Sequence, residues 1–359
     1  MSRSSRNIVL CIDGTQNTPS ANNTNVVRIF RLASEANCEN LTYYSPGIGT
    51  QPWPGSLRVF FSKAGRVLDS VSGLGMISSL SAAYNFLNEN YNTNDQLYFF
   101  GFSRGALTAR LLAGVIHQIG LLPRGHGHLV PYAINLALSD RPDEAESFSK
   151  SLGLCKPRTN FLGLFDSVKS TLSAIDAKTG VLRIRLPYSW YNDDVQHVRH
   201  AMAIDEKRSL FPVNRWADNS TRPGTEADGR TVKQVWFSGD HCDVGGGHIA
   251  SKGDLSVAPL VWMIKQAEEA GLKLAAPSKE ILDLATDYEK LAAIRCNDVA
   301  KCSWLILELF PSYSPNDDDK PRWRIMNLKR RSLYSVRWQA SSCTCERESE
   351  IAVWESGKR

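Results

Sequence analysis

Ser103 stands in a pattern whose residue types suit an activated serine nucleophile. The pattern reads Gly101-Phe102-Ser103-Arg104-Gly105, a G-x-S-x-G motif. A motif this short also arises by chance, so its surroundings decide its value. Residues 96–100 before it are strongly apolar, and residues 104–119 after it carry apolar side chains at helical spacing. We therefore predict a strand, a sharp turn and a helix, the arrangement that exposes a serine hydroxyl at the carboxyl edge of a sheet.

The two glycines of this motif are expected to have a steric role. Gly101 and Gly105 flank the serine because the turn is tight, and larger side chains there would clash with neighbouring elements. The turn also places the backbone N–H of Arg104 at the N-terminus of the expected helix. Because a backbone donor at this point suits a developing negative charge, Arg104 is predicted to form part of an oxyanion hole.

A serine nucleophile needs a base, and histidine is the usual one. The chain has 7 histidines, and those well downstream of Ser103 are His197, His200, His241 and His248. His241 follows an apolar stretch and precedes three consecutive glycines, where the backbone can be shaped freely. We predict His241 as the base, with His248 and His200 as the alternatives.

The histidine in turn needs an acid that orients its ring. In α/β-hydrolases the chain order is serine, acid, histidine. Asp166 fits this order because it closes the apolar stretch 161–165 and lies between Ser103 and His241. Asp243 competes for the role, but we expect it to support the adjacent glycine loop, and Asp240 is a weaker third choice.

The loop after the first apolar stretch is expected to supply a second oxyanion donor. Residues 7–12 run into Asp13-Gly14-Thr15, and the glycine allows a close backbone approach. The backbone N–H of Gly14 or of Thr15 is therefore predicted to face the oxyanion, with Asp13 hydrogen-bonding the loop.

The same loop argues against a phosphohydrolase with an aspartate nucleophile. Such an enzyme would need that aspartate two residues before Asp13, where the chain has Cys11, so the phosphohydrolase hypothesis is rejected.

Apolar stretches and helical stretches alternate along the chain. Strands are predicted at 7–12, 41–44, 96–100, 161–165 and 235–237, and helices at 26–33 (with Asn25 as N-cap), 75–91 and 104–119. Strands separated by helices indicate βαβ units. The expected fold is therefore α/β and α/β-hydrolase-like, with a mostly parallel sheet that carries helices on both faces.

The chain is expected to have one catalytic domain and an extension. Its 359 residues divide into a catalytic domain at 1–265 and a helical and irregular C-terminal extension at 266–359 that packs on the core. Residues 170–230 hold no clear core strand and many polar and aromatic side chains, so they are predicted to form a cap or insertion.

Composition excludes several classes of protein. Hydrophobic residues make up 42% and charged residues 22%, which is typical of a globular chain rather than a disordered one. The net charge of +5 is too small to argue for nucleic-acid binding. The 8 cysteines are scattered and lack zinc-ribbon spacing, so we predict neither a metal nor a cofactor.

No targeting segment is recognised in the sequence. The first apolar stretch is too short for a signal-peptide core, and no long uncharged apolar run suits a transmembrane helix. We expect the protein to be cytoplasmic in the cell that makes it. Any export would use a system that needs no signal peptide. Residues 53–66 mix aromatic, apolar and basic side chains and predict either peripheral membrane contact or a surface loop packed on the core.

Six motifs occur in order along the chain. They are Ile12-Asp-Gly-Thr15, Thr24-Asn25-Val26, Gly47-Ile48-Gly49-Thr50, Gly101-Phe-Ser-Arg-Gly-Ala106, Phe165-Asp166-Ser167-Val168 and His241-Cys-Asp-Val-Gly-Gly-Gly247. This set resembles the α/β-hydrolase domain family that includes the type VI secretion lipase effectors. The resemblance implies an α/β-hydrolase fold, a triad of Ser103, Asp166 and His241, and phospholipase or carboxylesterase activity. Val257 departs from the pattern, since an acidic residue is expected after the glycine loop.

The predicted function is therefore hydrolysis of carboxylic esters, most of all lipid or phospholipid acyl esters, through an acyl-enzyme. If the chain is an exported toxin, an immunity protein is an expected partner. The alternative is a non-catalytic binding or assembly module that keeps the fold without the chemistry. The intact Ser103, Asp166 and His241 favour the enzyme.

Overall fold

The computed structural model describes most of the first three quarters of the chain. The described residues are 5–15, 17, 19, 23–36, 40–47, 74–139, 141–168, 191–206, 208, 211–217, 229–248, 255–276, 312–315, 321–324 and 354–355. The predicted membrane-contact stretch 53–66 and much of the predicted cap lie outside these residues.

A mostly parallel sheet forms the centre of the described chain. Its strand order is β2-β1-β3-β4-β5-β6-β9, and the neighbours from β2 to β6 are parallel while β9 pairs antiparallel with β6. The strands are β1 (Asn7–Ile12), β2 (Asn40–Ser45), β3 (Gln96–Phe102), β4 (Thr159–Phe165), β5 (Val195–Ala203), β6 (Thr231–Phe237) and β9 (Trp354–Glu355). A separate antiparallel pair joins β7 (Ser312–Pro315) and β8 (Pro321–Arg324).

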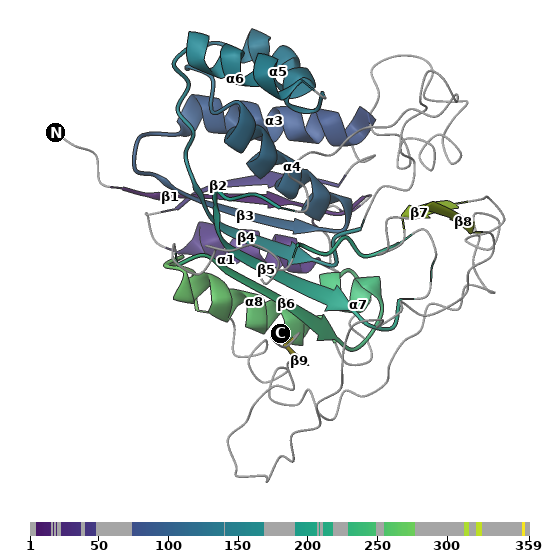
Figure 1. Ribbon diagram of the computed structural model, residues 1–359. Coiled ribbons are helices and arrows are strands. Elements are labelled where there is room, and N and C mark those ends of the chain that lie inside the picture. Colours follow the sequence, from purple (N-terminus) through teal and green to yellow (C-terminus); the bar gives the residue numbers. More distant parts are fainter. Residues whose placement is uncertain are drawn as a thin grey trace, which may run out of the picture.

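Helices cover both faces of the sheet, as Figure 1 shows. One face carries α3 (Leu74–Asn90) and α4 (Arg104–Gln118), with α5 (Val130–Ala137), α6 (Pro142–Ser151) and the short 3-10 helix η2 (Gly127–Leu129) outside them. The other face carries α1 (Asn25–Glu35) and α8 (Val257–Glu269), and α7 (His241–Gly245) follows β6. The α/β fold prediction is confirmed. None of the described helices combines the length and apolar character needed to cross a membrane.

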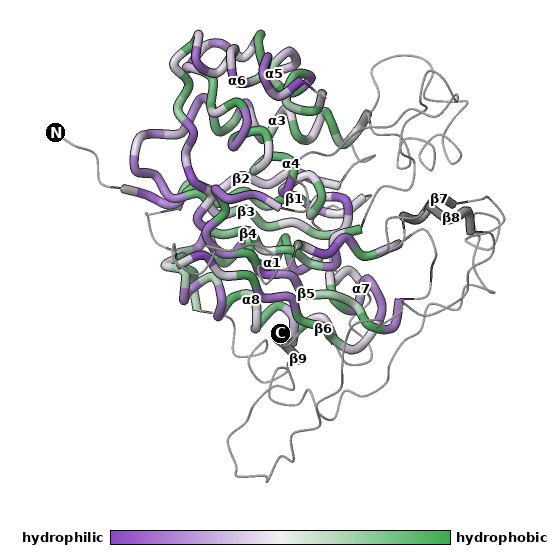
Figure 2. The backbone as a smooth tube through the Cα atoms, viewed as in Figure 1, coloured by the Kyte–Doolittle hydropathy of each residue, from purple (hydrophilic) through white to green (hydrophobic). Residues whose placement is uncertain are grey.

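The central strands are buried on both faces, which explains their apolar sequences. In β1, Ile8, Leu10 and Ile12 pack into the core on the α3 and α4 side. Val9 and Cys11 pack into the core on the α1 and α8 side. Successive side chains of a strand point to opposite faces, so an unbroken apolar run is needed to satisfy both layers. Figure 2 shows hydrophobic residues concentrated along these central strands.

The first helix begins one residue earlier than predicted. Thr24 is its N-cap, and the Thr24 Oγ1 accepts a hydrogen bond from the N–H of Val27 at 3.3 Å. Asn25, the predicted cap, is instead a fully buried helical residue. Its side-chain amide donates to the backbone carbonyls of Val244 and Ser256, at 2.9 and 2.8 Å. Asn25 therefore holds distant parts of the chain together, whereas its local sequence predicted a helix cap.

Strand β5 lies inside the stretch 170–230, which was expected to hold no core strand. That expectation is wrong for this segment, because β5 pairs in parallel with both β4 and β6. The strand lacks an apolar run because Arg199 and His200 are buried within it. Arg199 Nε donates to Gln266 Oε1 at 2.6 Å, and such pairing makes a buried polar group tolerable in a core strand.

Candidate active site

The predicted site residues gather at one edge of the sheet. Asp13 follows β1, Ser103 follows β3, Asp166 follows β4 and His241 opens α7 beyond β6. Because these strands are parallel, their carboxyl ends meet at the same edge, which is the usual ligand edge of an α/β sheet. Figure 1 shows the strand arrowheads on this side of the molecule, beside α7.

Ser103 forms a strained turn between β3 and α4. Its φ of 58° and ψ of −122° are uncommon for a residue with a side chain. A conformation of this kind costs on the order of 1–3 kcal/mol and recurs at functional sites. The Ser103 N–H donates to the carbonyl of Phe165 at 3.0 Å, so the end of β4 holds the turn in place. The strand, the sharp turn and the helix thus lie where the sequence predicts them, and the role of Ser103 as a nucleophile stays a prediction.

The two motif glycines allow the elbow to pack against backbone. A Cβ added to Gly101 would lie 2.5 Å from the Cα of Ala106. One added to Gly105 would lie 2.2 Å from the carbonyl oxygen of Ile12 and 2.4 Å from that of Asp13. The start of α4 therefore rests directly on the end of β1, and only glycine fits there.

Asp166 and His241 are joined by a short hydrogen bond. His241 Nδ1 lies 2.6 Å from Asp166 Oδ2, and both side chains are buried. Asp166 Oδ1 also accepts the N–H of Ala203 at 2.9 Å, and the Asp166 N–H donates to the carbonyl of Ala201. The carboxylate is thus fixed by β5 on one oxygen and orients the imidazole with the other.

Two aromatic rings enclose the His241 imidazole. The Phe102 ring lies 4.6 Å from it between centroids, and the Phe211 ring meets it edge-on at 5.0 Å. A Cβ on Gly245 would lie 1.9 Å from Phe102, so this glycine makes room for the ring. Because Phe102 precedes Ser103, this contact brings β3 and α7 together.

No hydrogen bond joins Ser103 Oγ to His241 within the described chain. Catalytic sites often form such bonds only with substrate bound.

The alternative bases and acids have other partners. His200 Nε2 accepts the N–H of Ser167 at 3.0 Å, and His248 Nε2 lies 3.2 Å from Asp240 Oδ1. Asp240 caps α7, and Asp243 Oδ2 accepts the Asp240 N–H at 2.9 Å to complete a capping box. Asp243 thus supports the start of the helix that carries His241, whereas the sequence predicted that it supports the adjacent glycine loop.

The loop after β1 lies against the elbow. A Cβ on Gly14 would be 3.2 Å from the Cβ of Ser103. The Gly14 N–H donates to Asp13 Oδ1 at 2.7 Å, so of the two predicted donors in this loop the Thr15 N–H is the one left to face an oxyanion. Within the described chain neither that N–H nor the buried Thr15 Oγ1 has a hydrogen-bond partner. The Arg104 N–H, the other predicted donor, lies at the first position of α4, where an N–H has no partner within its own helix.

Asp13 is the organising group of this loop. Besides Gly14, the hydroxyls of Thr24 and Tyr44 each donate to Asp13 Oδ2 at 2.8 Å. Burial raises the pKa of the Asp13 carboxyl above its usual value, although these hydrogen bonds act in the opposite direction.

The side chain of Arg104, the residue after Ser103, is also affected by burial, which lowers the pKa of its guanidinium to about 10.

Asp13→Ala is expected to lower turnover by roughly 10²–10³-fold, because the loop that presents the Thr15 N–H would lose its anchor. The check is kcat for a p-nitrophenyl ester, with thermal unfolding measured in parallel. Tyr44→Phe serves as control, since it removes one hydrogen bond to Asp13 and should cost only about 1 kcal/mol of stability. Equal turnover in the two variants would contradict the role assigned to the loop.

Two residues at this edge were missed by the sequence analysis. Glu206 and Arg208 follow β5 and are buried beside His241, with Glu206 Oε2 accepting the His241 N–H at 3.3 Å. The sequence signal for them is an acidic pair, Asp205-Glu206, that begins two residues after the end of β5. This signal depends on β5, which the sequence did not predict.

Asp240, Cys242 and His248 are the described side chains that approach the spacing of a metal site, with one ligand atom from each within 4.8 Å of the others. Asp240 Oδ1 already accepts the N–H groups of Cys242 and Asp243 as the cap of α7. These contacts account for the group as a helix cap, and the prediction of no metal stays a prediction.

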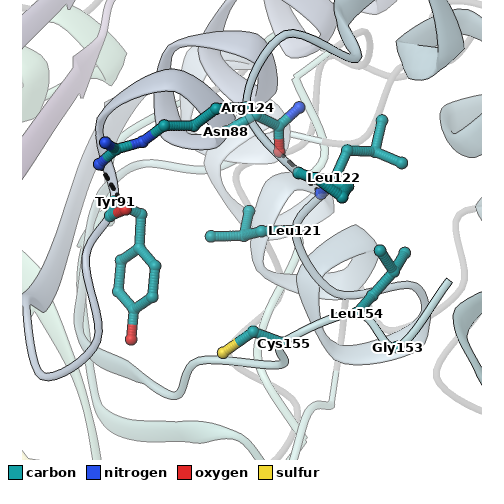
Figure 3. Close-up of a pocket in the computed structure, with 9 residues that line it drawn as sticks. Asn88, Tyr91, Leu121, Leu122, Arg124, Gly153, Leu154 and Cys155 are labelled. Carbon is teal, nitrogen blue, oxygen red and sulfur yellow. Dashed lines mark hydrogen bonds between the residues drawn. The ribbon is translucent and has the colours of Figure 1, made fainter.

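A cavity of about 270 Å³ lies at the opposite edge of the sheet. Figure 3 shows its lining, which includes Asn88 and Tyr91 from the end of α3 and Leu121 and Arg124 from the turn after α4. Because α3 leads into β3 and α4 runs back from its end, these segments meet at the amino edge. The cavity is therefore separate from Ser103.

Residues 6–266 match the family model described as "T6SS, Phospholipase effector Tle1-like, catalytic domain". The chain belongs to this family. A curated relative, the uncharacterized protein YEL023C of Saccharomyces cerevisiae, is 34% identical to this chain over 229 residues. That alignment covers 58% of this chain and 32% of the relative, so the chain spans about a third of the yeast protein's length.

Two solved structures are similar to this chain. An uncharacterized protein from Pseudomonas aeruginosa is 18% identical with a TM-score of 0.44, covering 83% of this chain and 52% of that chain. The Tle1 effector bound to the VgrG spike of the type 6 secretion system is 15% identical with a TM-score of 0.43, covering 81% and 80%.

Proposed function

We propose that the chain hydrolyses carboxylic esters, with lipid or phospholipid acyl esters as its substrates. The observation that carries this is the hydrogen bond of 2.6 Å between His241 and Asp166 at the edge where Ser103 forms a strained elbow. The match of residues 6–266 to a phospholipase effector family supports the lipid class.

In the proposed reaction the Ser103 hydroxyl attacks the ester carbonyl while His241 Nε2 takes its proton. The Nδ1–H of the same ring donates to Asp166, whose charge stabilises the imidazolium. The oxyanion accepts hydrogen bonds from the N–H groups of Thr15 and Arg104. The imidazolium then protonates the departing alcohol, and a water molecule activated by His241 releases the acyl group from Ser103.

A fluorophosphonate probe tests the reaction without a guess about the substrate. We expect intact-mass analysis to show one adduct on the wild-type protein and none on Ser103→Ala, because the probe labels only a serine that a base activates. Release of fatty acid from phosphatidylcholine and phosphatidylglycerol vesicles then tests the lipid class. Delivery by a secretion system and an immunity partner remain predictions.

The competing function is a binding or assembly module with the same fold. A folded wild-type protein that takes no adduct, and whose circular dichroism matches that of Ser103→Ala, would overturn the hydrolase and leave this alternative. Labelling of Ser103 without fatty-acid release would keep the esterase and reject the lipid substrate.

A further inference from the structure

The segment after β5 surrounds the proposed catalytic histidine with groups that the mechanism above does not use. We propose that the buried Glu206–Arg208 ion pair, together with Phe211, is a positioning unit that fixes both the backbone and the ring of His241. This inference rests on the proposed function, since it concerns the base of that reaction.

Glu206 holds the backbone of His241. Its side chain is fully buried, and its Oε2 accepts both the His241 N–H, at 3.3 Å, and Arg208 Nη2, at 2.7 Å. Its Oε1 accepts the N–H and Nε of Arg208, each at 2.8 Å. Burial alone would raise the Glu206 pKa, but the hydrogen bonds and charge of Arg208 outweigh it and keep the pKa below its ordinary value. The carboxylate is therefore ionised at neutral pH and held by four donors.

Arg208 connects this carboxylate to the ring of His241 through Phe211. The guanidinium carbon of Arg208 lies 3.9 Å from the centroid of the Phe211 ring, within the range of a cation–π contact. The Phe211 ring meets the His241 ring at 5.0 Å with an interplanar angle of 65°, an edge-to-face contact. Phe211 and Phe102 therefore both restrict the imidazole, and the ion pair restricts Phe211.

His241 needs this support because its own helix is too short to supply it. α7 has 5 residues, and isolated helices of that length are unstable. Asp166 fixes only Nδ1 of the ring. The hydrogen bond from its backbone N–H to Glu206 and the ring contact with Phe211 therefore help to direct Nε2 toward Ser103. Buried ion pairs contribute little net stability, so we look for the effect of this pair in catalysis.

The Glu206 carboxylate also contributes to the negative charge around the imidazole. The charged groups packed near His241 are Asp166 from β4, Glu206 and Arg208 from the segment after β5, and Asp240 and Asp243 from its own helix and cap. Loss of the Glu206 charge would remove one of these carboxylates and the hydrogen-bonded counter-ion of Arg208. The loss of negative charge there disfavours the imidazolium that the reaction must form.

Glu206→Gln tests the proposal because its amide oxygen can still accept the His241 N–H, while the charge is removed and an NH₂ replaces the oxygen that accepts the Arg208 N–H and Nε. We expect kcat for a p-nitrophenyl ester to fall by about tenfold to a hundredfold with KM unchanged. The acid limb of kcat/KM should move to lower pH by roughly one unit. A role in stability alone would lower the melting temperature and leave the pH profile in place.

Glu144→Gln is the matched control. Glu144 makes an ion pair of similar length with Arg141, at 2.9 Å, but both side chains are more than half exposed and lie at the N-terminus of α6. It should leave kcat, KM and the pH profile at their wild-type values. Phe211→Leu provides a second variant that creates no unpaired buried charge, and it should lower kcat severalfold without moving the acid limb.

The outcomes separate this inference from the proposed function. A wild-type protein that takes no fluorophosphonate adduct overturns the function and the inference together. A wild type that is labelled, with Glu206→Gln and Phe211→Leu turning over at wild-type rates, overturns only the inference. If Glu206→Gln does not fold, an unchanged kcat in Phe211→Leu is sufficient to reject it.

Discussion

Asp166→Asn is expected to lower kcat for ester hydrolysis by about 10⁴-fold while the protein stays folded. Asp166 Oδ2 lies 2.6 Å from His241 Nδ1 and accepts a hydrogen bond from the Nδ1–H. An amide NH₂ at this position favours the other tautomer of the ring, with the proton on Nε2. The imidazole could then no longer accept the Ser103 proton. The loss should fall on kcat because substrate contacts are unchanged.

A second aspartate–histidine pair in the same chain provides the control. His117 Nδ1 lies 2.7 Å from Asp194 Oδ2. This pair joins the end of α4 to the residue before β5, at the sheet edge opposite Ser103. Asp194→Asn makes the same chemical change and should leave kcat unchanged. Equal losses in the two variants, or full activity in Asp166→Asn, would exclude Asp166 as the orienting acid.

Gly105→Ala is expected to destabilise the protein by about 3 kcal/mol or more, and to remove activity with it. Helix propensity predicts the opposite sign, since alanine is favoured over glycine in a helix by about 1 kcal/mol. The steric cost dominates because the new Cβ would lie 2.2 Å from the carbonyl oxygen of Ile12. That neighbour is backbone in the central sheet, so relief requires α4 and Ser103 to move.

Urea unfolding measures this change, and Gly127→Ala is its control. At Gly127 a Cβ would meet only the side-chain oxygen of Asn85, at 2.8 Å, which a rotation of that side chain relieves. We expect a change in unfolding free energy below about 1 kcal/mol. A Gly105→Ala protein as stable as wild type would show that the elbow does not need glycine.

The sequence predicted the part of the site that follows strong local patterns. The strands before Asp13, Ser103 and Asp166 are apolar runs, and each residue with reactive chemistry comes directly after such a run. Parallel strands then bring these residues to one edge without further information. The elbow glycines were also predictable, because a sharp turn between a strand and a helix demands small residues.

Local patterns failed where buried polar groups are satisfied by distant residues. β5 was missed because Arg199 and His200 interrupt its apolar character, and the partner that makes Arg199 acceptable, Gln266, lies far along the chain. Asn25 suits a helix cap locally, yet its amide is used by two carbonyls from the other end of the domain. No window along the sequence contains such pairs.

The sequence by itself therefore determined the α/β layering and the prediction that Ser103, Asp166 and His241 act together. Burial on both faces and sharp turns impose their own residue types, and these patterns are readable from local sequence. The tertiary structure alone decided that the Gly14 N–H donates to Asp13 and that Glu206 accepts the backbone N–H of His241. Both depend on which groups meet after the strands have assembled, because a hydrogen bond or an ion pair is specified by proximity in space.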